Sequence, residues 1–332
     1  KSAGNVIAPQ KVINQLGADV LRLWVASTDY SAEMTISDEI LARSADAYRR
    51  LRNTARFLLA NLVDVDPARH AVPPQDLVAL DRWLLRRAVA LDAQVRDAYS
   101  AFQFHEISQK VHHFCAVDLG AFYLDIIKDR QYTCPADSAA RRSAQTAMYH
   151  VLEALVRWLA PILSFTAEDI WQHLPGARED SVLLAQWYAL PTLPDEATET
   201  LRPADWERLR AIRDAVNRQL ERLRVAGDIG SALDAEVDLY VNAGDRALLD
   251  RLGDELRFAL ICSYARVHAD TARPTDVHAD ADLWLTARAS AHPKCIRCWH
   301  HREDVGSDAQ HPQLCGRCIE NVSGAGERRQ FA

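Results

Sequence analysis

The sequence lacks any run of about 18 apolar residues, the minimum for a membrane-spanning helix, although 48% of its 332 residues are hydrophobic. It also lacks a basic excess, because 39 Lys and Arg face 46 Asp and Glu, giving a formal net charge of -7. This balance argues against a protein that coats nucleic acid non-specifically, but it permits local basic surfaces. Internal repeats and low-complexity tracts are absent. These features indicate a cytosolic globular protein of two or three domains.

The seven cysteines lack the pattern of a disulfide framework, because their number is odd and no secretory segment or initiator methionine precedes Lys1. Four of them form two pairs with two-residue spacing, separated by 16 residues. Two such pairs complete a tetrahedral shell of four thiolates, which Zn2+ favours. The sequence therefore predicts one structural zinc ion, and the weaker alternatives are an iron–sulfur site or two redox pairs. The predicted ligands are Cys295, Cys298, Cys315 and Cys318, with His300, His301 and His311 as less favoured candidates.

Apolar residues recur at helical spacing through the first half of the chain. A loop rich in proline separates the second of these segments from the third, and Thr166-Ala167-Glu168-Asp169 resembles a capping box that begins a short final helix. The pattern predicts a helical bundle. The expected helices cover residues 18–27, 38–62, 77–99, 104–132 and 140–160.

The pattern changes after Leu174. A strand is predicted at 182–187, and a proline-rich acidic linker marks a boundary near residue 195. Beyond it, a helix at 204–227 with Gly227 as its C-cap is followed by alternating strand and helix patterns, which predict a small α+β domain. The expected later elements are strands at 235–242, 262–268 and 283–287 and a helix at about 247–260.

Basic and aromatic residues gather at three places. One is a helix face with Arg49, Arg52 and Arg56, a pattern that is also typical of a solvated face. The other two are a helix end, where cations complement the dipole or grip an RNA backbone, and the cysteine-rich segment. In the cysteine-rich segment an indole lies beside guanidinium groups. These side chains would either stack on RNA or pack the segment against its neighbouring domain. The helix end contains Lys128, Arg130 and Tyr132, and the cysteine-rich segment contains Trp299 and Arg317.

The remaining cysteines do not suggest a nucleophile. Only His112 and Cys115 share a face of the predicted helix, and no third group orients them. We expect Cys134 and Cys262 to be buried thiols.

Four stretches resemble the C-terminal part of a bacterial-type isoleucyl-tRNA synthetase, a class I aminoacyl-tRNA synthetase. "KSAGNVIAPQ" and the residues after it are similar to the segment that follows the family's Lys-Met-Ser-Lys-Ser loop, and "RRLRNTARFLLANL" with "DLGAFYLDIIKDRQYT" resembles its anticodon-binding bundle. "GDIGSALDAEVDLYV" is similar to its junction domain, and "KCIRCWHH…LCGRC" to its zinc knuckle. The resemblance implies an ATP-dependent isoleucine–tRNA ligase, with ATP and Mg2+ as substrate and isoleucine tRNA as partner.

In that family the second lysine of the loop approaches the ATP phosphates, and Lys1 matches it. The rest of the catalytic core does not match any part of this sequence, so we expect no complete catalytic site and no activity from these residues alone. The resemblance divides the sequence into the end of the catalytic core (1–37), the bundle (38–190), the junction domain (195–290) and the knuckle (291–332). We expect a cytoplasmic monomer.

Two other hypotheses stay open on the sequence. The first is a stand-alone tRNA-binding zinc protein without ligase activity. The second is a DNA glycosylase with a similar four-cysteine knuckle, but such enzymes need a catalytic N-terminal Pro or Glu, which Lys1 does not supply.

Overall fold

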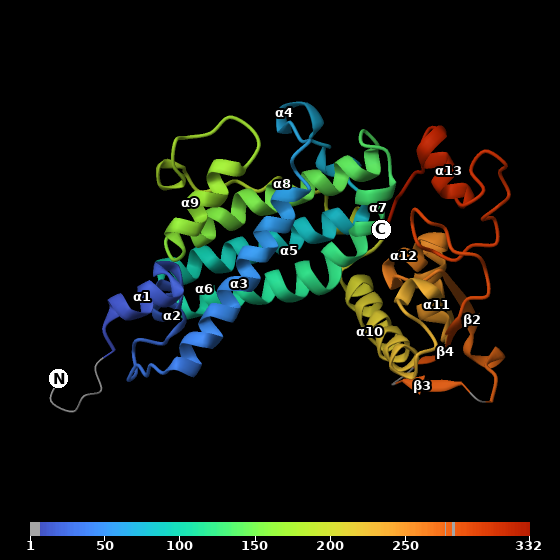
Figure 1. Cartoon of the computed structure of the whole chain (residues 1–332), viewed down its shortest axis with the longest axis horizontal. Helices are drawn as coiled ribbons and strands as arrows, with labels where there is room; N and C mark the ends of the chain where they lie inside the picture. Colours follow the sequence, from blue (N-terminus) through green and yellow to red (C-terminus); the bar gives the residue numbers. More distant parts are fainter. Residues whose placement is uncertain (1–6, 276, 281–282) are drawn as a thin grey trace. The chain divides into compact units, whose positions relative to one another are not determined.

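A computed structural model describes residues 7–275, 277–280 and 283–332. The residues group into two compact units (Figure 1). Unit 1 comprises Leu84–Asp125, Gln145–Leu193 and the described part of Lys1–Gln75, and unit 2 comprises Asp76–Trp83, Ile126–Ala144 and Pro194–Ala332. No helix in the described part of the chain is both long and apolar enough to cross a bilayer.

Unit 1 is a bundle of helices, which confirms the predicted class. α8 (Ala139–Leu159) contributes much of the core, where its residues Met148, Val151 and Leu155 are fully buried. Its helices are α1 (Pro9–Leu16), α2 (Ala18–Ser27), α3 (Asp38–Ala60), α4 (Pro67–His70), α6 (Phe104–His113), α9 (Ser164–His173) and most of α5 (Ala79–Ser100) and α8 (Ala139–Leu159).

The helix predicted over 104–132 is divided into three. A π-helical segment, Phe114–Tyr123, separates α6 from α7 (Leu124–Thr133). Gly120 lies within it, and a Cβ added there would stand 3.1 Å from the carbonyl oxygen of Cys115. Apolar periodicity alone does not distinguish this wider turn from an α-helix.

Two local predictions in unit 1 are wrong. Residues 182–187 do not form a strand; a 3-10 turn covers Val182–Leu184, and the described part of unit 1 contains no strand with which they could pair. Thr166 does not cap α9, because it lies inside that helix and its hydroxyl donates to Asp19 Oδ2 over 2.6 Å. The Asp19 carboxylate of α2 also accepts from the Thr166 backbone N–H.

Unit 2 contains a four-stranded sheet in the order β2-β1-β4-β3. β1 pairs with β2 in parallel and with β4 antiparallel. The predicted strands are confirmed, and β3 is an addition to them. The strands are β1 (Ala235–Val241), β2 (Tyr264–Ala269), β3 (His278–Asp280) and β4 (Leu283–Ala289), and the helices are α10 (Pro203–Ala226), α11 (Ala243–Leu252), α12 (Leu256–Leu260), α13 (Gly316–Ser323) and most of α7.

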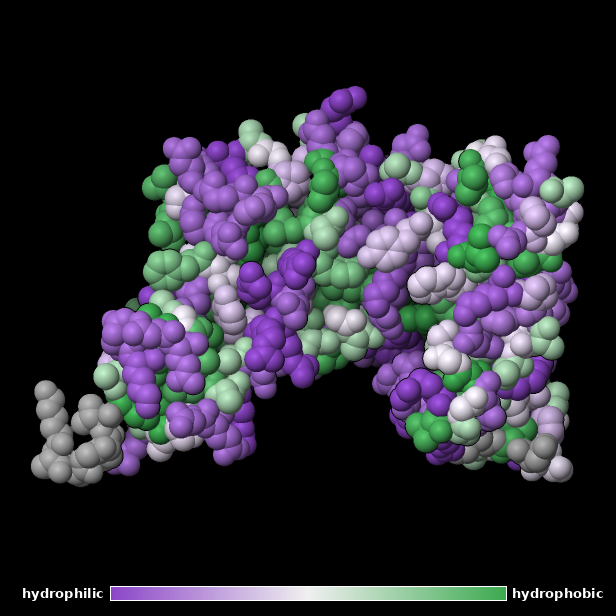
Figure 2. Space-filling view, in the orientation of Figure 1, coloured by the Kyte–Doolittle hydropathy of each residue, from purple (hydrophilic) through white to green (hydrophobic). Residues whose placement is uncertain are grey.

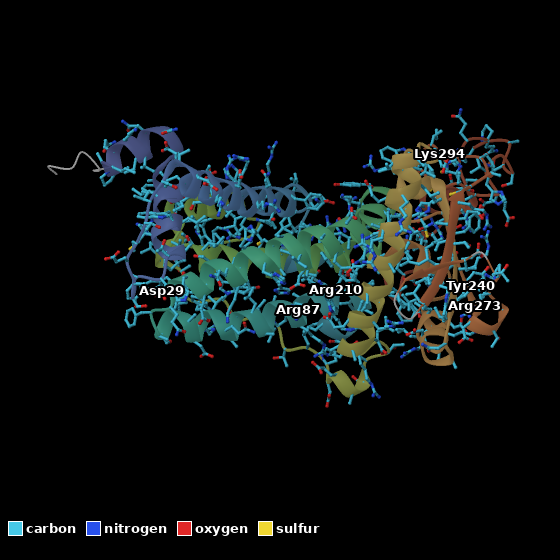
Figure 3. The ribbon with its side chains drawn as sticks, turned by 90° about the horizontal axis from the view of Figure 1, so that it is seen from below. Asp29, Arg87, Arg210, Tyr240, Arg273 and Lys294 are labelled. Atoms are coloured by element: carbon cyan, nitrogen blue, oxygen red, sulfur yellow. The ribbon has the colours of Figure 1, made fainter. Side chains whose placement is uncertain are left out.

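The two faces of the sheet differ in chemistry. Val237 and Leu239 of β1 are fully buried, as expected for the face covered by helices. The alternate residues, Glu236 and Asp238, pair with the flanking Arg266 and Arg288. Figure 3 shows Tyr240 and Lys294 at opposite ends of this sheet. α10 ends as predicted, with Gly227 at φ 82°.

Candidate metal centre

The four predicted cysteine ligands converge in unit 2. Their sulfur atoms all lie within 4.8 Å of one another, and each residue is buried. The Sγ atoms of Cys298 and Cys315 are 3.7 Å apart, far beyond the length of a disulfide bond.

Local backbone turns create this convergence. In the first knuckle, Trp299 adopts φ 65° and its N–H donates to the carbonyl of Cys295 over 2.9 Å. The Cys295 N–H donates to the carbonyl of His300, which closes the turn. In the second knuckle Cys315 is the N-cap of α13, and its N–H donates to the sulfur of Cys295 over 3.4 Å.

The donor set fits Zn2+. Four thiolates at about 2.3 Å from a tetrahedral zinc ion stand about 3.8 Å from each other, close to the Cys298–Cys315 separation. Because all four positions of the shell are filled by protein, such a site is structural and leaves no position open for catalysis. Zinc would supply the cross-link that joins the two knuckles.

The three histidines considered as spare ligands serve other contacts. Among the described residues, the group that could hold a metal contains cysteines alone. His300 is buried against Phe258, and His301 contacts Asp234 at 3.3 Å. His311 contacts the hydroxyl of Ser323 at 3.2 Å.

The other three cysteines are buried, as predicted for Cys134 and Cys262. Burial raises the pKa of Cys115, Cys134 and Cys262 to about 12. A thiol that remains protonated and buried is a poor nucleophile.

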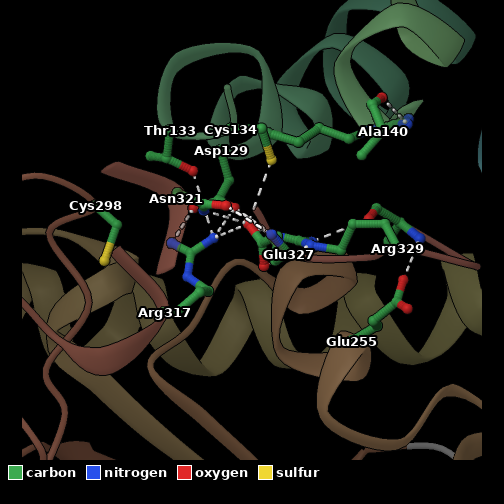
Figure 4. A network of polar contacts seen from close by, with 12 residues as sticks. Asp129, Thr133, Cys134, Ala140, Glu255, Cys298, Arg317, Asn321, Glu327 and Arg329 are labelled. Atoms are coloured by element: carbon green, nitrogen blue, oxygen red, sulfur yellow. Dashed lines mark hydrogen bonds and ion pairs between the residues drawn. The ribbon is translucent and has the colours of Figure 1, made fainter. Parts of the chain in front are cut away.

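A polar network connects the knuckles to α7 (Figure 4). Both oxygens of Asp129 accept from Arg317, at 2.6 and 2.8 Å. Arg329 donates to the same carboxylate at 2.6 Å, and Glu327 binds both arginines. In the other knuckle, Arg297 donates to the carbonyl of Thr133, the last residue of α7, over 3.1 Å.

This network changes the proton affinity of its members. Burial by itself would raise the pKa of the Asp129 carboxyl, but the charge of Arg317 and the other contacts of this carboxylate together outweigh burial and hold that pKa well below its ordinary value. His300 and Arg329 act in the same direction. Burial would likewise lower the pKa of Arg317, yet the charge and hydrogen bonds of Asp129, together with the charge of Glu327, raise it well above the usual range. Both groups are therefore charged, and the pair is an ion pair over the physiological pH range.

The basic residues predicted on the bundle lie on the exposed face of α3. Arg49 pairs with Asp46 at 2.9 Å, and Arg52 and Arg56 are exposed. Hydrophilic residues, coloured purple, gather along this helix on the face shown in Figure 2. The placement agrees with a solvated face and with a phosphate-binding face alike.

The residues predicted at the end of α7 differ in their exposure to solvent. Lys128 is exposed, and so is Tyr132, at 61% of its surface. Arg130 is 1% exposed, and its Nη1 donates to Asp81 over 2.8 Å and to the carbonyl of Ala140. This placement corrects the expectation that Arg130 meets an RNA backbone, because the guanidinium points into the core.

The residues predicted in the zinc knuckles also differ in their exposure to solvent. Trp299 is exposed over 61% of its surface, whereas the side chain of Arg317 is 12% exposed and engaged by Asp129. Packing, one of the two alternatives for this segment, therefore describes Arg317, whereas stacking on RNA stays a prediction for Trp299. Sequence reasoning missed Asp129 and Thr133, although Asp129 stands between two residues that it selected. The shared position of arginine in "CIRC" and "CGRC" was the available signal.

Three family models match the chain. Residues 81–239 match the anticodon-binding domain of tRNA ligase, residues 293–321 match the zinc finger found in FPG and IleRS, and residues 1–37 match the class I tRNA synthetases (I, L, M and V). The isoleucine–tRNA ligase of Thioalkalivibrio sulfidiphilus is 59% identical over all of this chain, and that of Nitrosococcus oceani is 60% identical. The chain belongs to the bacterial isoleucine–tRNA ligase family.

The match covers all of this chain but only part of each relative. The chain spans 36% of the T. sulfidiphilus relative and 35% of those from N. oceani and Methylococcus capsulatus, the last being 59% identical. In agreement with the match to the zinc-finger model, the four cysteines form a structural zinc site. The comparisons do not favour the alternative of a stand-alone tRNA-binding zinc protein. Lys1, assigned to the ATP-binding loop by resemblance, lies outside the described residues.

Proposed function

We propose that this chain supplies the tRNA-binding part of an ATP-dependent isoleucine–tRNA ligase, acting as a cytoplasmic monomer on isoleucine tRNA. The division into residues 1–37, 38–190, 195–290 and 291–332 belongs to the same proposal, as does contact between Lys1 and ATP. Adenylate formation, with isoleucine, ATP and Mg2+ as substrates, belongs to the whole ligase.

One observation carries the proposal. The contacts of Arg297 and Arg317 bring the zinc knuckles against α7, whose end also presents Lys128 and Tyr132. Trp299 projects from the first knuckle. The combination of exposed aromatic rings with a cation is the chemistry that unpaired RNA bases and their phosphates require. Arg49, Arg52 and Arg56 on α3 are proposed as backbone contacts.

The test is a titration of the zinc-loaded chain with isoleucine tRNA and with a non-cognate tRNA at several salt concentrations. Because a stacked base contributes about 1–3 kcal/mol, we expect Trp299→Ala and Tyr132→Ala each to weaken binding by about tenfold or more. Phe165→Ala, which removes an aromatic ring of similar exposure from α9, is the matched control and should bind normally.

The cationic residues have a separate signature. Lys128→Ala and Arg52→Ala should each lower the slope of log affinity against log salt by about one. Arg246→Ala on α11, an exposed arginine that pairs with Asp250, serves as the control. Equal affinity for the two tRNAs at every salt concentration would contradict specific recognition.

A further inference from the structure

The two zinc knuckles carry an arginine at the same place, the third residue of each Cys-x-x-Cys turn. The first reads Cys295-Ile-Arg-Cys298 and the second Cys315-Gly-Arg-Cys318. Both arginines, Arg297 and Arg317, extend to α7. Each arginine stands between the two cysteine ligands of its turn, so the geometry of the metal site fixes its position.

The two contacts fall on one face of α7. Arg317 forms two hydrogen bonds with Asp129, and Arg297 donates to the carbonyl of Thr133, four residues later. Residues at i and i+4 are neighbours on a helix surface. The Thr133 carbonyl belongs to the last turn, where carbonyls have no partner within the helix and where a cation complements the helix dipole. One arginine therefore anchors the helix by an ion pair and the other caps its end.

We propose that Arg297 and Arg317 are positioning residues through which zinc occupancy controls the end of α7. With zinc bound, the four sulfur atoms fix both turns, and both guanidinium groups are held against the helix. Without zinc the two turns lose this cross-link and are joined only by weaker contacts, such as the bonds from the Cys315 N–H to the sulfur of Cys295 and from the Ile296 N–H to the carbonyl of Gln313. Lys128 and Tyr132 each precede an anchored residue by one position, so their order depends on the same contacts. The part of this inference that concerns RNA rests on the proposed function; the coupling of zinc to α7 does not.

Coupling between two sites is reciprocal. If zinc orders α7 through these arginines, the contacts on α7 must in turn strengthen zinc binding. Asp129→Asn retains the shape of the side chain but removes the charge that Arg317 meets. We expect this substitution to weaken zinc binding by about tenfold in competition with a chromogenic chelator.

Hydrogen–deuterium exchange of the full chain tests the coupling directly. The chain is compared with one zinc ion bound and after its removal by chelation under reducing conditions. We expect amides near residues 130–134 to exchange at least tenfold faster without zinc, while α10, a helix of the same unit that contributes none of these contacts, stays unchanged. Faster exchange in the knuckles alone, with α7 unaffected, would overturn the proposal.

The double variant Arg297→Met/Arg317→Met separates positioning from simple stability. It keeps all four cysteines, so we expect it to retain zinc, to exchange rapidly at the end of α7 with zinc bound, and to lose the response of α7 to zinc removal. Arg328→Met, an exposed arginine of the same C-terminal segment, should behave as the parent. If the double variant does not hold zinc, Arg297→Met alone gives the same comparison at the capped end. An α7 that still responds to zinc in these variants would contradict the assignment.

Binding of isoleucine tRNA is measured on the same samples. Failure of the zinc-loaded parent to bind isoleucine tRNA would reject the proposed function and leave the exchange result standing. If the parent binds, we expect zinc removal and the double variant each to weaken binding by about tenfold. Undiminished affinity in both would overturn the link between the anchored helix and RNA.

Discussion

Arg130 and Asp81 form an ion pair that is closed to solvent, with exposed side-chain fractions of 1% and 0%. The Ser143 hydroxyl also binds this carboxylate. The carboxylate lies 49 residues before the arginine, so the pair joins the beginning of α5 to α7 within unit 2.

Removing one partner should be costly. We expect Arg130→Met to lower the free energy of unfolding by about 3–5 kcal/mol, because it leaves the Asp81 carboxylate buried without its counter-charge. Urea denaturation followed by circular dichroism measures the change. Arg56→Met, on the exposed face of α3, should change stability by less than about 0.5 kcal/mol. The double variant Asp81→Leu/Arg130→Met should be more stable than Arg130→Met, and equal loss in both would contradict the argument.

The metal content of the chain distinguishes ligands from other buried cysteines. We expect one zinc ion per chain by atomic absorption after dialysis, and well under half an ion in Cys298→Ser, which replaces one thiolate. Cys115→Ala removes a buried thiol of unit 1 and should keep its zinc. Full zinc content in Cys298→Ser would remove this cysteine from the ligand set.

His150 should make stability depend on pH. Burial lowers the pKa of His150 to about 4, although Glu153 raises it, and Nδ1 lies 2.7 Å from the hydroxyl of Tyr188. The unfolded chain protonates this histidine near pH 6.5, whereas the folded chain does so only near pH 4. The stabilisation is therefore complete above pH 6.5 and falls as the pH drops from 6.5 to 4, by up to about 3 kcal/mol.

Urea denaturation at pH 7.5, 6 and 5 checks this dependence. The difference in unfolding free energy between the parent and His150→Gln should shrink as the pH falls. His173→Gln, at an exposed histidine near the end of α9, controls for the general effect of acid. A difference that is constant from pH 7.5 to 5 would exclude His150 as the source.

Gly227 allows a test of backbone conformation alone. Its φ of 82° lies in the left-handed region, and a Cβ at this position would meet nothing within 4 Å. We expect Gly227→Ala to lower the free energy of unfolding by about 1 kcal/mol, because alanine is strained at a positive φ. Gly227→Asn should lower it by less, since asparagine tolerates this conformation better. Thermal unfolding of the three proteins gives the comparison, and identical midpoints would contradict the cause.

Local chemistry made several features readable from the sequence. A two-residue turn is sufficient to bring Cys295 and Cys298 onto one ion. Gly227 ends α10 because a residue without a Cβ adopts a positive φ without strain. The helices of the bundle follow from apolar periodicity, because each helix must bury one face wherever its partners lie. Strand β1 follows from its β-branched and apolar residues between turn signals.

Only the tertiary structure decided how neighbouring charged residues are used. Lys128 and Arg130 look alike in sequence, yet one is exposed and the other buried, because the partner carboxylate Asp81 comes from a distant segment. Trp299 beside the first knuckle and Arg317 in the second likewise differ, because Trp299 is exposed to solvent whereas Arg317 is buried against Asp129. A side chain's environment depends on long-range packing, which short-range spacing does not specify. The sequence therefore determined the metal ligands and the helical class, whereas packing between distant segments decided which basic and aromatic groups are exposed.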